Sequence, residues 1–125
     1  FDVVVGLESR GFWFAVPIAQ ALSLPFVPIR KKGKLPRRTV SASYTLEYGK
    51  DTIQMHKYDV KPGSRVLIVD DVVATGGTVL AVKHLMEQVG ARAEHLLVLG
   101  SLEDLPEGPS KLEKAGIMVH SLLKL

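Results

Sequence analysis

The sequence contains no cysteine, and this absence excludes disulfide bonds and thiol-based catalysis. It also lacks any run of about 18 consecutive apolar residues, so no transmembrane helix is expected. The opening stretch Phe1–Gly6 has neither the basic segment nor the long apolar segment of a signal peptide. These absences fit a protein of a reducing compartment, and we expect a cytoplasmic location without a membrane partner.

The composition is that of an ordinary globular protein. The 125 residues are 46% hydrophobic and 23% charged, which is typical of one domain with a modest core. We therefore expect a single domain over residues 1–125. The formal net charge is +3, a mild excess that suits a small anionic substrate and leaves nucleic acid as an alternative partner.

Short apolar runs rich in β-branched residues recur along the chain. The runs at Val3–Val5, Val66–Val69 and His95–Leu99 are bounded by glycine or charge, as central parallel strands buried on both faces usually are. Phe26–Arg30 and Val119–Leu123 add two further short strands. The strands of this series are separated by patterns of helical length, which predicts an α/β fold with a central, mainly parallel sheet flanked by helices.

Two helices follow from the same patterns. Apolar residues on one face predict a helix over Thr78–Val89, and Gly90 is a suitable residue to end it. A second helix is expected to run from a Ser9 cap towards Leu22. Pro17 disfavours the middle of that helix, so we expect a late start or a kink there.

A polar stretch, Lys31–Lys57, interrupts the alternation of strands and helices. We interpret it as a flexible loop or hairpin outside the sheet, and a loop of this length is usually functional or disordered. Its start is strongly basic and taken alone would fit a solvated charge patch or a nucleic-acid patch. The six basic residues are Arg30, Lys31, Lys32, Lys34, Arg37 and Arg38.

The most informative stretch is Val66–Thr78, in which a buried strand ends in Asp70 and Asp71 and a loop of small residues leads into a helix. Ligands of open α/β sheets bind beyond the carboxyl ends of strands. Gly76 and Gly77 allow main-chain amides to approach a ligand closely, and the helix supplies its positive dipole end. We therefore expect a phosphate site built from Ala74, Thr75, Gly76, Gly77 and Thr78.

The two aspartates suit hydroxyl groups rather than phosphate, because like charges repel. The stretch thus predicts a sugar-phosphate site, with the diol on Asp70 and Asp71. The alternative is an ordinary turn with surface acids and a glycine hinge. The stretch is neither a Walker loop nor a Rossmann fingerprint, since the required Gly-Lys-Ser/Thr and Gly-x-Gly-x-x-Gly patterns are missing.

Three segments together resemble one family. Val66–Thr78 is similar to the phosphoribosyl-pyrophosphate signature of type I phosphoribosyltransferases. Gly6–Phe12 resembles the pyrophosphate loop of the adenine phosphoribosyltransferases within them, although Ser9 and Arg10 also fit a capped, solvated helix start. The basic run followed by Ala42–Gly49 resembles the flexible catalytic loop of the same family. The resemblance covers nearly the whole chain and implies the type I phosphoribosyltransferase fold.

The resemblance also implies a reaction and its participants. Adenine and phosphoribosyl pyrophosphate would give AMP and pyrophosphate, with Mg²⁺ carried by the substrate and no direct protein ligand. The substrate-binding residues would then be Ser9, Arg10, Arg30, Lys31, Lys34, Tyr48, Asp70, Asp71 and Ala74–Thr78. Glu47 would be the catalytic acid/base, and the peptide between Glu8 and Ser9 would be cis. A homodimer without a nucleic-acid partner is expected.

Some alternatives stay open at this point. Family members carry about fifty residues ahead of the position of Phe1 that form a hood over the purine, and we expect this part to be absent here. The base could therefore be another purine. The chain could also be a non-catalytic relative that binds phosphoribosyl pyrophosphate or a nucleotide, or a regulator that keeps the fold as an effector module.

Overall fold

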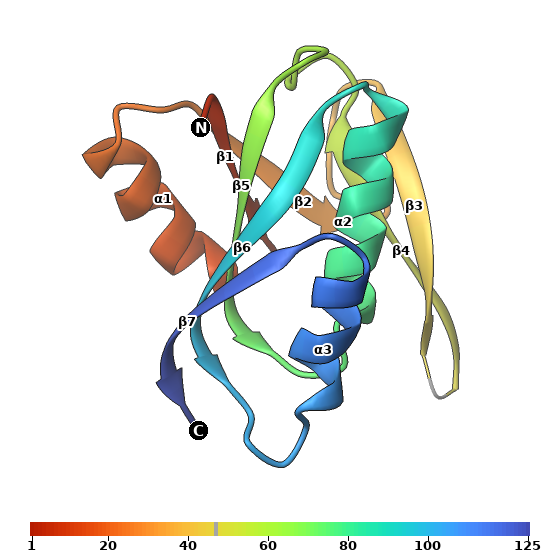
Figure 1. Ribbon diagram of the computed structural model, residues 1–125. Helices are drawn as coiled ribbons and strands as arrows, with labels where there is room; N and C mark the ends of the chain where they lie inside the picture. Colours follow the sequence, from red (N-terminus) through yellow and green to blue (C-terminus); the bar gives the residue numbers. More distant parts are fainter. Residues whose placement is uncertain (47) are drawn as a thin grey trace.

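A central β-sheet organises the computed structural model, which describes residues 1–46 and 48–125 (Figure 1). The strands within these residues are β1 (Val3–Leu7), β2 (Phe26–Lys31), β3 (Thr39–Leu46), β4 (Gly49–His56), β5 (Arg65–Val73), β6 (Arg92–Ser101) and β7 (Met118–Lys124). They form one sheet in the order β3-β4-β2-β1-β5-β6-β7. The neighbours from β2 to β7 pair in parallel, which confirms the predicted α/β class with a mainly parallel sheet.

Helices cover both faces of the sheet. Helix α1 (Gly11–Ala21) lies on one face, whereas α2 (Gly77–Gln88) and α3 (Glu107–Lys114) lie on the other (Figure 1). Two buried clusters result, one around Val4 and Ala15 beneath α1, the other around Ile68 and Leu85 beneath α2. Within the described ranges, no helix is long and apolar enough to cross a membrane.

Helix α1 begins differently from the prediction. Arg10 rather than Ser9 holds the cap position, and no side chain caps this end of the helix. Ser9 instead belongs to a tight turn in which its carbonyl accepts the Phe12 N–H at 3.2 Å. The expected late start is also wrong, because Pro17 lies inside the helix. Pro17 is on the exposed side of α1, where water can hydrate the carbonyl that has lost its donor.

The end of α2 confirms the role predicted for Gly90. This residue has a φ of +76°, and its N–H donates to the Glu87 carbonyl at 3.1 Å. The next N–H, from Ala91, reaches back to the Met86 carbonyl at 2.9 Å. A left-handed residue followed by such a long return bond is a common helix ending that glycine adopts without steric cost.

The polar stretch forms a hairpin of β3 and β4, but its expected position outside the sheet is wrong. Strand β4 pairs antiparallel with β2 through Arg30 opposite Gln54 and Lys31 opposite Ile53. The physical reason is an alternation in β4, because Ile53 and Met55 point into the core while Gln54 does not. The base of the hairpin therefore belongs to the sheet, and its far end extends beyond it (Figure 1).

Candidate active site

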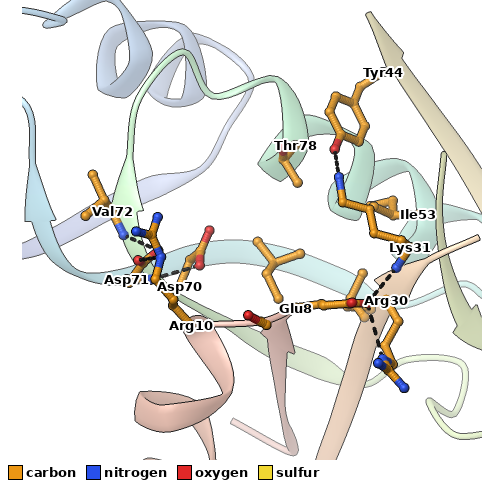
Figure 2. Close-up of a pocket in the computed structure, with 13 residues that line it drawn as sticks. Glu8, Arg10, Arg30, Lys31, Tyr44, Ile53, Asp70, Asp71, Val72 and Thr78 are labelled. Carbon is orange, nitrogen blue, oxygen red and sulfur yellow. Dashed lines mark hydrogen bonds and ion pairs between the residues drawn. The ribbon is translucent and has the colours of Figure 1, made fainter. Parts of the chain in front are cut away.

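The ends of three adjacent strands enclose one cavity. The loop after β1, the last residues of β2 and the end of β5 meet there, because parallel neighbours present their carboxyl ends at the same edge of a sheet. Figure 2 shows the side chains that line this cavity. Predicted site residues from these three places and from the start of α2 are among them, namely Ser9, Arg10, Arg30, Lys31, Asp70, Asp71 and Thr78.

The predicted phosphate loop, Ala74–Thr78, borders a second hollow that adjoins the first. The two share Asp70, Val72 and Thr78. Gly76 has a φ of +86° and occupies the cap position of α2. No side chain in the described part of the chain caps this helix, so the first amides of α2 are available to hydrogen-bond an anion.

Asp70 lines both hollows, and Asp71 lines the first. The Asp71 N–H donates to Oδ1 of Asp70 at 2.8 Å, and the Val72 N–H donates to Oδ1 of Asp71 at 2.8 Å. The other oxygen of Asp71, Oδ2, lies 2.6 Å from Nε of Arg10 (Figure 2). The Arg10 side chain is 72% exposed and that of Asp71 only 13%, so water can solvate a displaced Arg10, whereas Asp71 would then need another hydrogen-bond donor.

Burial raises the pKa of Asp70 from 3.8 to about 7. The neighbouring Asp71 carboxylate adds to the rise, while the Asp71 N–H and the charge of Arg10 oppose it. Near neutral pH the Asp70 carboxyl is thus divided between its acid and its ionised form. A ligand that donates hydroxyl hydrogen bonds to Asp70 would favour the ionised form.

Gly11 explains why Arg10 and the two aspartates meet. A Cβ atom at this position would lie 2.9 Å from Oδ1 of Asp70 and 3.3 Å from the Val69 carbonyl oxygen. Helix α1 therefore starts in direct contact with the end of β5, and only glycine fits the contact without a shift. The residue just before it, Arg10, is held beside Asp71 as a result.

Glu8 was not among the predicted site residues, yet it ties the loop after β1 to the end of β2. Its Oε1 accepts the Lys31 N–H at 2.9 Å and Nε of Arg30 at 3.2 Å. Burial acts to raise the pKa of Glu8, but these hydrogen bonds and the Arg30 charge outweigh it and lower that pKa. The peptide between Glu8 and Ser9 is cis, as the family resemblance implied.

The ammonium group of Lys31 is held by the hairpin. Its Nζ lies 2.6 Å from the Tyr44 hydroxyl, contacts the Asp51 carboxylate and sits 5.2 Å from the centre of the Tyr44 ring. Tyr44 and Asp51 face each other across β3 and β4. Burial disfavours the charged lysine, but the bonds to Asp51 and Tyr44 outweigh this and raise its pKa. Neither partner of Lys31 was predicted from the sequence.

Other predicted site residues lie away from the cavity. Lys34 is exposed in the turn after β2, and Tyr48 is 94% exposed on the hairpin. Glu47, the predicted acid/base, lies outside the described residues. Within the basic run, Arg37 has a structural role, since its guanidinium pairs with both oxygens of Asp59 at 2.9 and 3.2 Å.

Comparison with known proteins identifies the family. The family model of the phosphoribosyl transferase domain matches residues 1–115. An adenine phosphoribosyltransferase of Lachnoclostridium phytofermentans is 52% identical over 124 residues, which cover 99% of this chain and 70% of that protein. The chain belongs to the adenine phosphoribosyltransferase family. This confirms the resemblance predicted from the three sequence segments.

Solved structures of the family share the fold. The adenine phosphoribosyltransferase of Rhodothermus marinus matches with a TM-score of 0.94 at 48% identity, over 100% of this chain and 70% of that one. The Trypanosoma brucei enzyme, solved with AMP, pyrophosphate and ribose-5-phosphate, matches with a TM-score of 0.88 at 29% identity. That match covers 98% of this chain and 56% of the trypanosomal one. The predicted type I phosphoribosyltransferase fold is thereby confirmed.

Proposed function

We propose that this chain transfers the phosphoribosyl group of phosphoribosyl pyrophosphate to adenine, giving AMP and pyrophosphate in purine salvage. The observation that carries the proposal is the arrangement around Asp70 and Asp71. Asp70 lines both the hollow at the loop Ala74–Thr78 and the cavity that Asp71, Arg10, Arg30 and Lys31 line. This order matches the order of 5′-phosphate, ribose and pyrophosphate in the donor substrate.

Each part of the donor has a group of residues of suitable chemistry. The amides and hydroxyls of Ala74–Thr78 would bind the 5′-phosphate, as helix N-termini bind anions elsewhere. Asp70 and Asp71 would accept hydrogen bonds from the ribose hydroxyls. The pyrophosphate would lie against Ser9, Arg10, Arg30 and Lys31, with Lys34 reaching it from the turn after β2.

The cations of the pyrophosphate site already have anionic partners. Arg10 pairs with Asp71, Arg30 with Glu8, and Lys31 with Asp51. We infer that the arriving pyrophosphate draws Arg10 and Lys31 away from their carboxylates, since it carries more charge than either. Release of Arg10 also frees Asp71 for the ribose, which links binding of the two parts of the donor.

The reaction breaks the bond between the anomeric carbon and the pyrophosphate oxygen before purine N9 has fully bonded, so the sugar gains oxocarbenium character as in glycoside hydrolysis. The basic residues would stabilise the leaving pyrophosphate. Glu47 would assist proton transfer at the purine, and Tyr48 would cover the reactants from the hairpin. Covering the reactants excludes water, which would otherwise hydrolyse the activated sugar.

Magnesium would enter with the donor. Within residues 1–46 and 48–125 there is no cluster of three potential metal ligands, and the acids Asp70 and Asp71 line the cavity. This donor set fits Mg²⁺, which prefers substrate phosphates with few protein ligands. Bound there, Mg²⁺ would neutralise charge on the pyrophosphate. The donor would hold the ion, and Asp70 and Asp71 would orient the donor by binding its ribose hydroxyls.

Formation of AMP tests the proposal. We expect the purified protein to form AMP from adenine and phosphoribosyl pyrophosphate in the presence of Mg²⁺, and to lose this activity with excess EDTA. Chromatographic separation of the nucleotides measures the product. Hypoxanthine, guanine and xanthine, supplied in parallel, test the alternative of another purine. Binding of the donor without turnover of any base would favour the non-catalytic alternative and contradict the proposed activity.

We further propose that the protein is a homodimer and that the outer face of α1 is its interface. No charged residue occurs between Gly11 and Leu24, and Trp13 is 75% exposed. An apolar groove lined by Phe14, Ile18 and Leu122 continues this face towards β7. An uncharged, apolar face suits a second copy of itself, because a two-fold contact brings like surfaces together.

Replacement of Trp13 by lysine is expected to convert the dimer into a monomer, because two lysines would be buried near the two-fold axis. Sedimentation velocity should give twice 13.6 kDa for the unmodified chain and 13.6 kDa for Trp13→Lys. Ser110→Lys, on the exposed side of α3, adds the same charge elsewhere and should leave the dimer intact. A Trp13→Lys protein that stays dimeric would exclude this face as the interface.

A cytoplasmic location remains a prediction, which cell fractionation would test.

A further inference from the structure

Helix α3 touches the phosphate loop through a glycine. Gly108 is buried at the start of α3, and a Cβ atom built on it would overlap the carbonyl oxygen of Ala74 and lie 2.9 Å from the Ala74 carbonyl carbon. The same atom would lie 3.5 Å from the carbonyl carbon of Thr75. The contact is therefore between two main chains, with no side chain between them.

The loop meets α3 through a second glycine. A Cβ atom at Gly76 would lie 3.2 Å from the Gly108 carbonyl oxygen and 3.2 Å from Cγ of Leu112. Leu112 is fully buried and belongs to the larger core cluster beneath α2. We call Gly76, Gly108 and Leu112 the glycine contact. It joins the loop to a part of the molecule that the core holds in place.

The glycine contact lies at the loop that would bind the 5′-phosphate. Ala74 and Thr75 are exposed, and both line the second hollow. A loop of small residues, taken alone, has many conformations, and its amides converge on one anion in few of them. The packing of α3 against one side of the loop reduces this freedom and leaves the other side for the ligand.

We propose that Gly108 is a positioning residue for the phosphate site: its missing side chain lets α3 fix the conformation of Ala74–Gly76 in which the amides bind the 5′-phosphate. The inference rests on the proposed function, because it takes the 5′-phosphate to bind at this loop. Gly108 itself touches no substrate. It acts through the carbonyl of Ala74 and through Gly76.

The substitution Gly108→Ala separates this role from a merely structural one. Alanine favours a helix more than glycine does, so a role confined to helix α3 would predict equal or greater stability and unchanged ligand binding. The positioning role predicts the opposite for one ligand only. The added methyl group must push α3 or Ala74 aside, which disturbs the amides of the phosphate loop and leaves the distant pyrophosphate residues unaffected.

Isothermal titration of the whole protein with ribose-5-phosphate, and separately with magnesium pyrophosphate, tests the inference. For Gly108→Ala we expect affinity for ribose-5-phosphate to fall by about 10-fold, a change of ordinary size for a disturbed charged hydrogen-bond site. Affinity for magnesium pyrophosphate should change by less than about 2-fold, within the usual effect of a distant substitution. Ser110→Ala, an exposed position of the same helix, should change neither.

Leu112→Val provides a milder second variant in case Gly108→Ala does not fold. It removes one carbon beside Gly76, and we expect a smaller loss of affinity that is again selective for ribose-5-phosphate. Undiminished affinity for ribose-5-phosphate in a folded Gly108→Ala protein, or an equal loss of affinity for both ligands in both variants, would overturn the inference.

The single substitution Thr78→Val, made in the otherwise unmodified protein, tests the proposed function separately. If ribose-5-phosphate binds but Thr78→Val leaves its affinity unchanged, the phosphate assignment itself is wrong.

Discussion

Replacement of Asp70 by asparagine is expected to stabilise the protein at pH 8 by about 2–4 kcal/mol. Burial raises the pKa of Asp70 to about 7 in the folded protein, against 3.8 for an ordinary aspartate. Well below pH 3.8 the Asp70 carboxyl is protonated in both the folded and the unfolded chain, so it does not alter the free energy of unfolding. As the pH rises towards 7 the unfolded chain ionises first, and the folded protein loses stability until both forms are ionised.

Urea denaturation at several pH values between 4 and 8 measures this effect. The difference in unfolding free energy between Asp70→Asn and the unmodified protein should grow with pH and level off above pH 7. Asp104→Asn, on an exposed loop, controls for the removal of one negative charge. A difference that is constant with pH would show that burial does not raise the pKa of Asp70.

The same substitution should weaken the binding of the sugar. Loss of a charged acceptor for the ribose hydroxyls is expected to cost about 1–3 kcal/mol in ribose-5-phosphate affinity, and Asp71→Asn should cost a similar amount. A substitution that raises the free energy of unfolding but lowers ligand affinity indicates a residue that serves binding although it destabilises the fold. Unaltered affinity in both variants would refute the role of these acids in binding the diol.

The second large effect is expected for Glu47→Gln, which should lower turnover by about 100-fold or more, as is usual for loss of a general acid/base. Glutamine keeps the size of the side chain but cannot carry the proton. Steady-state rates of AMP formation, together with equilibrium binding of phosphoribosyl pyrophosphate, measure the change. We expect kcat to fall while the dissociation constant of the donor changes much less.

A change elsewhere on the hairpin provides the control for Glu47. Ser43→Ala removes an exposed hydroxyl whose partner is Thr52, at 3.0 Å, and should leave turnover close to that of the unmodified protein. Should Glu47→Gln turn over at the normal rate, the proton would have to be handled by another group. Equal losses for Glu47→Gln and Ser43→Ala would point to a general disturbance of the hairpin instead.

The parallel part of the sheet and the motif on β5 could be predicted from sequence because their signals are local. A strand buried on both faces is a continuous apolar run, and Val66–Val69 has this form directly ahead of the two acids. The position of β4 could not be predicted in the same way. Only Ile53 and Met55 carry the apolar alternation of that strand, inside a stretch that is otherwise polar.

The residues that the sequence analysis missed depend on register rather than on motif. Asp51 meets Lys31 because β4 lies beside β2, and twenty residues separate the two in the chain. Glu8 stands next to the predicted Ser9 and Arg10, but its bonds to the end of β2 follow from the pairing of β1 with β2. Gly108 lies in the last third of the chain, where the sequence offers no comparable pattern.

The pairing of β1 with β5 fixes the spacing between two parts of the proposed site. Gly6 lies opposite Val69, so the loop that begins at Glu8 starts beside Asp70 and Asp71, which continue β5. Adjacent strands are about 4.8 Å apart, a spacing fixed by main-chain hydrogen bonds. Under the proposed function, the backbone of the sheet would thus set the spacing between the residues that bind the pyrophosphate and those that bind the sugar. Substitutions of side chains in the loop after β1 or beside the two acids would leave this spacing unchanged.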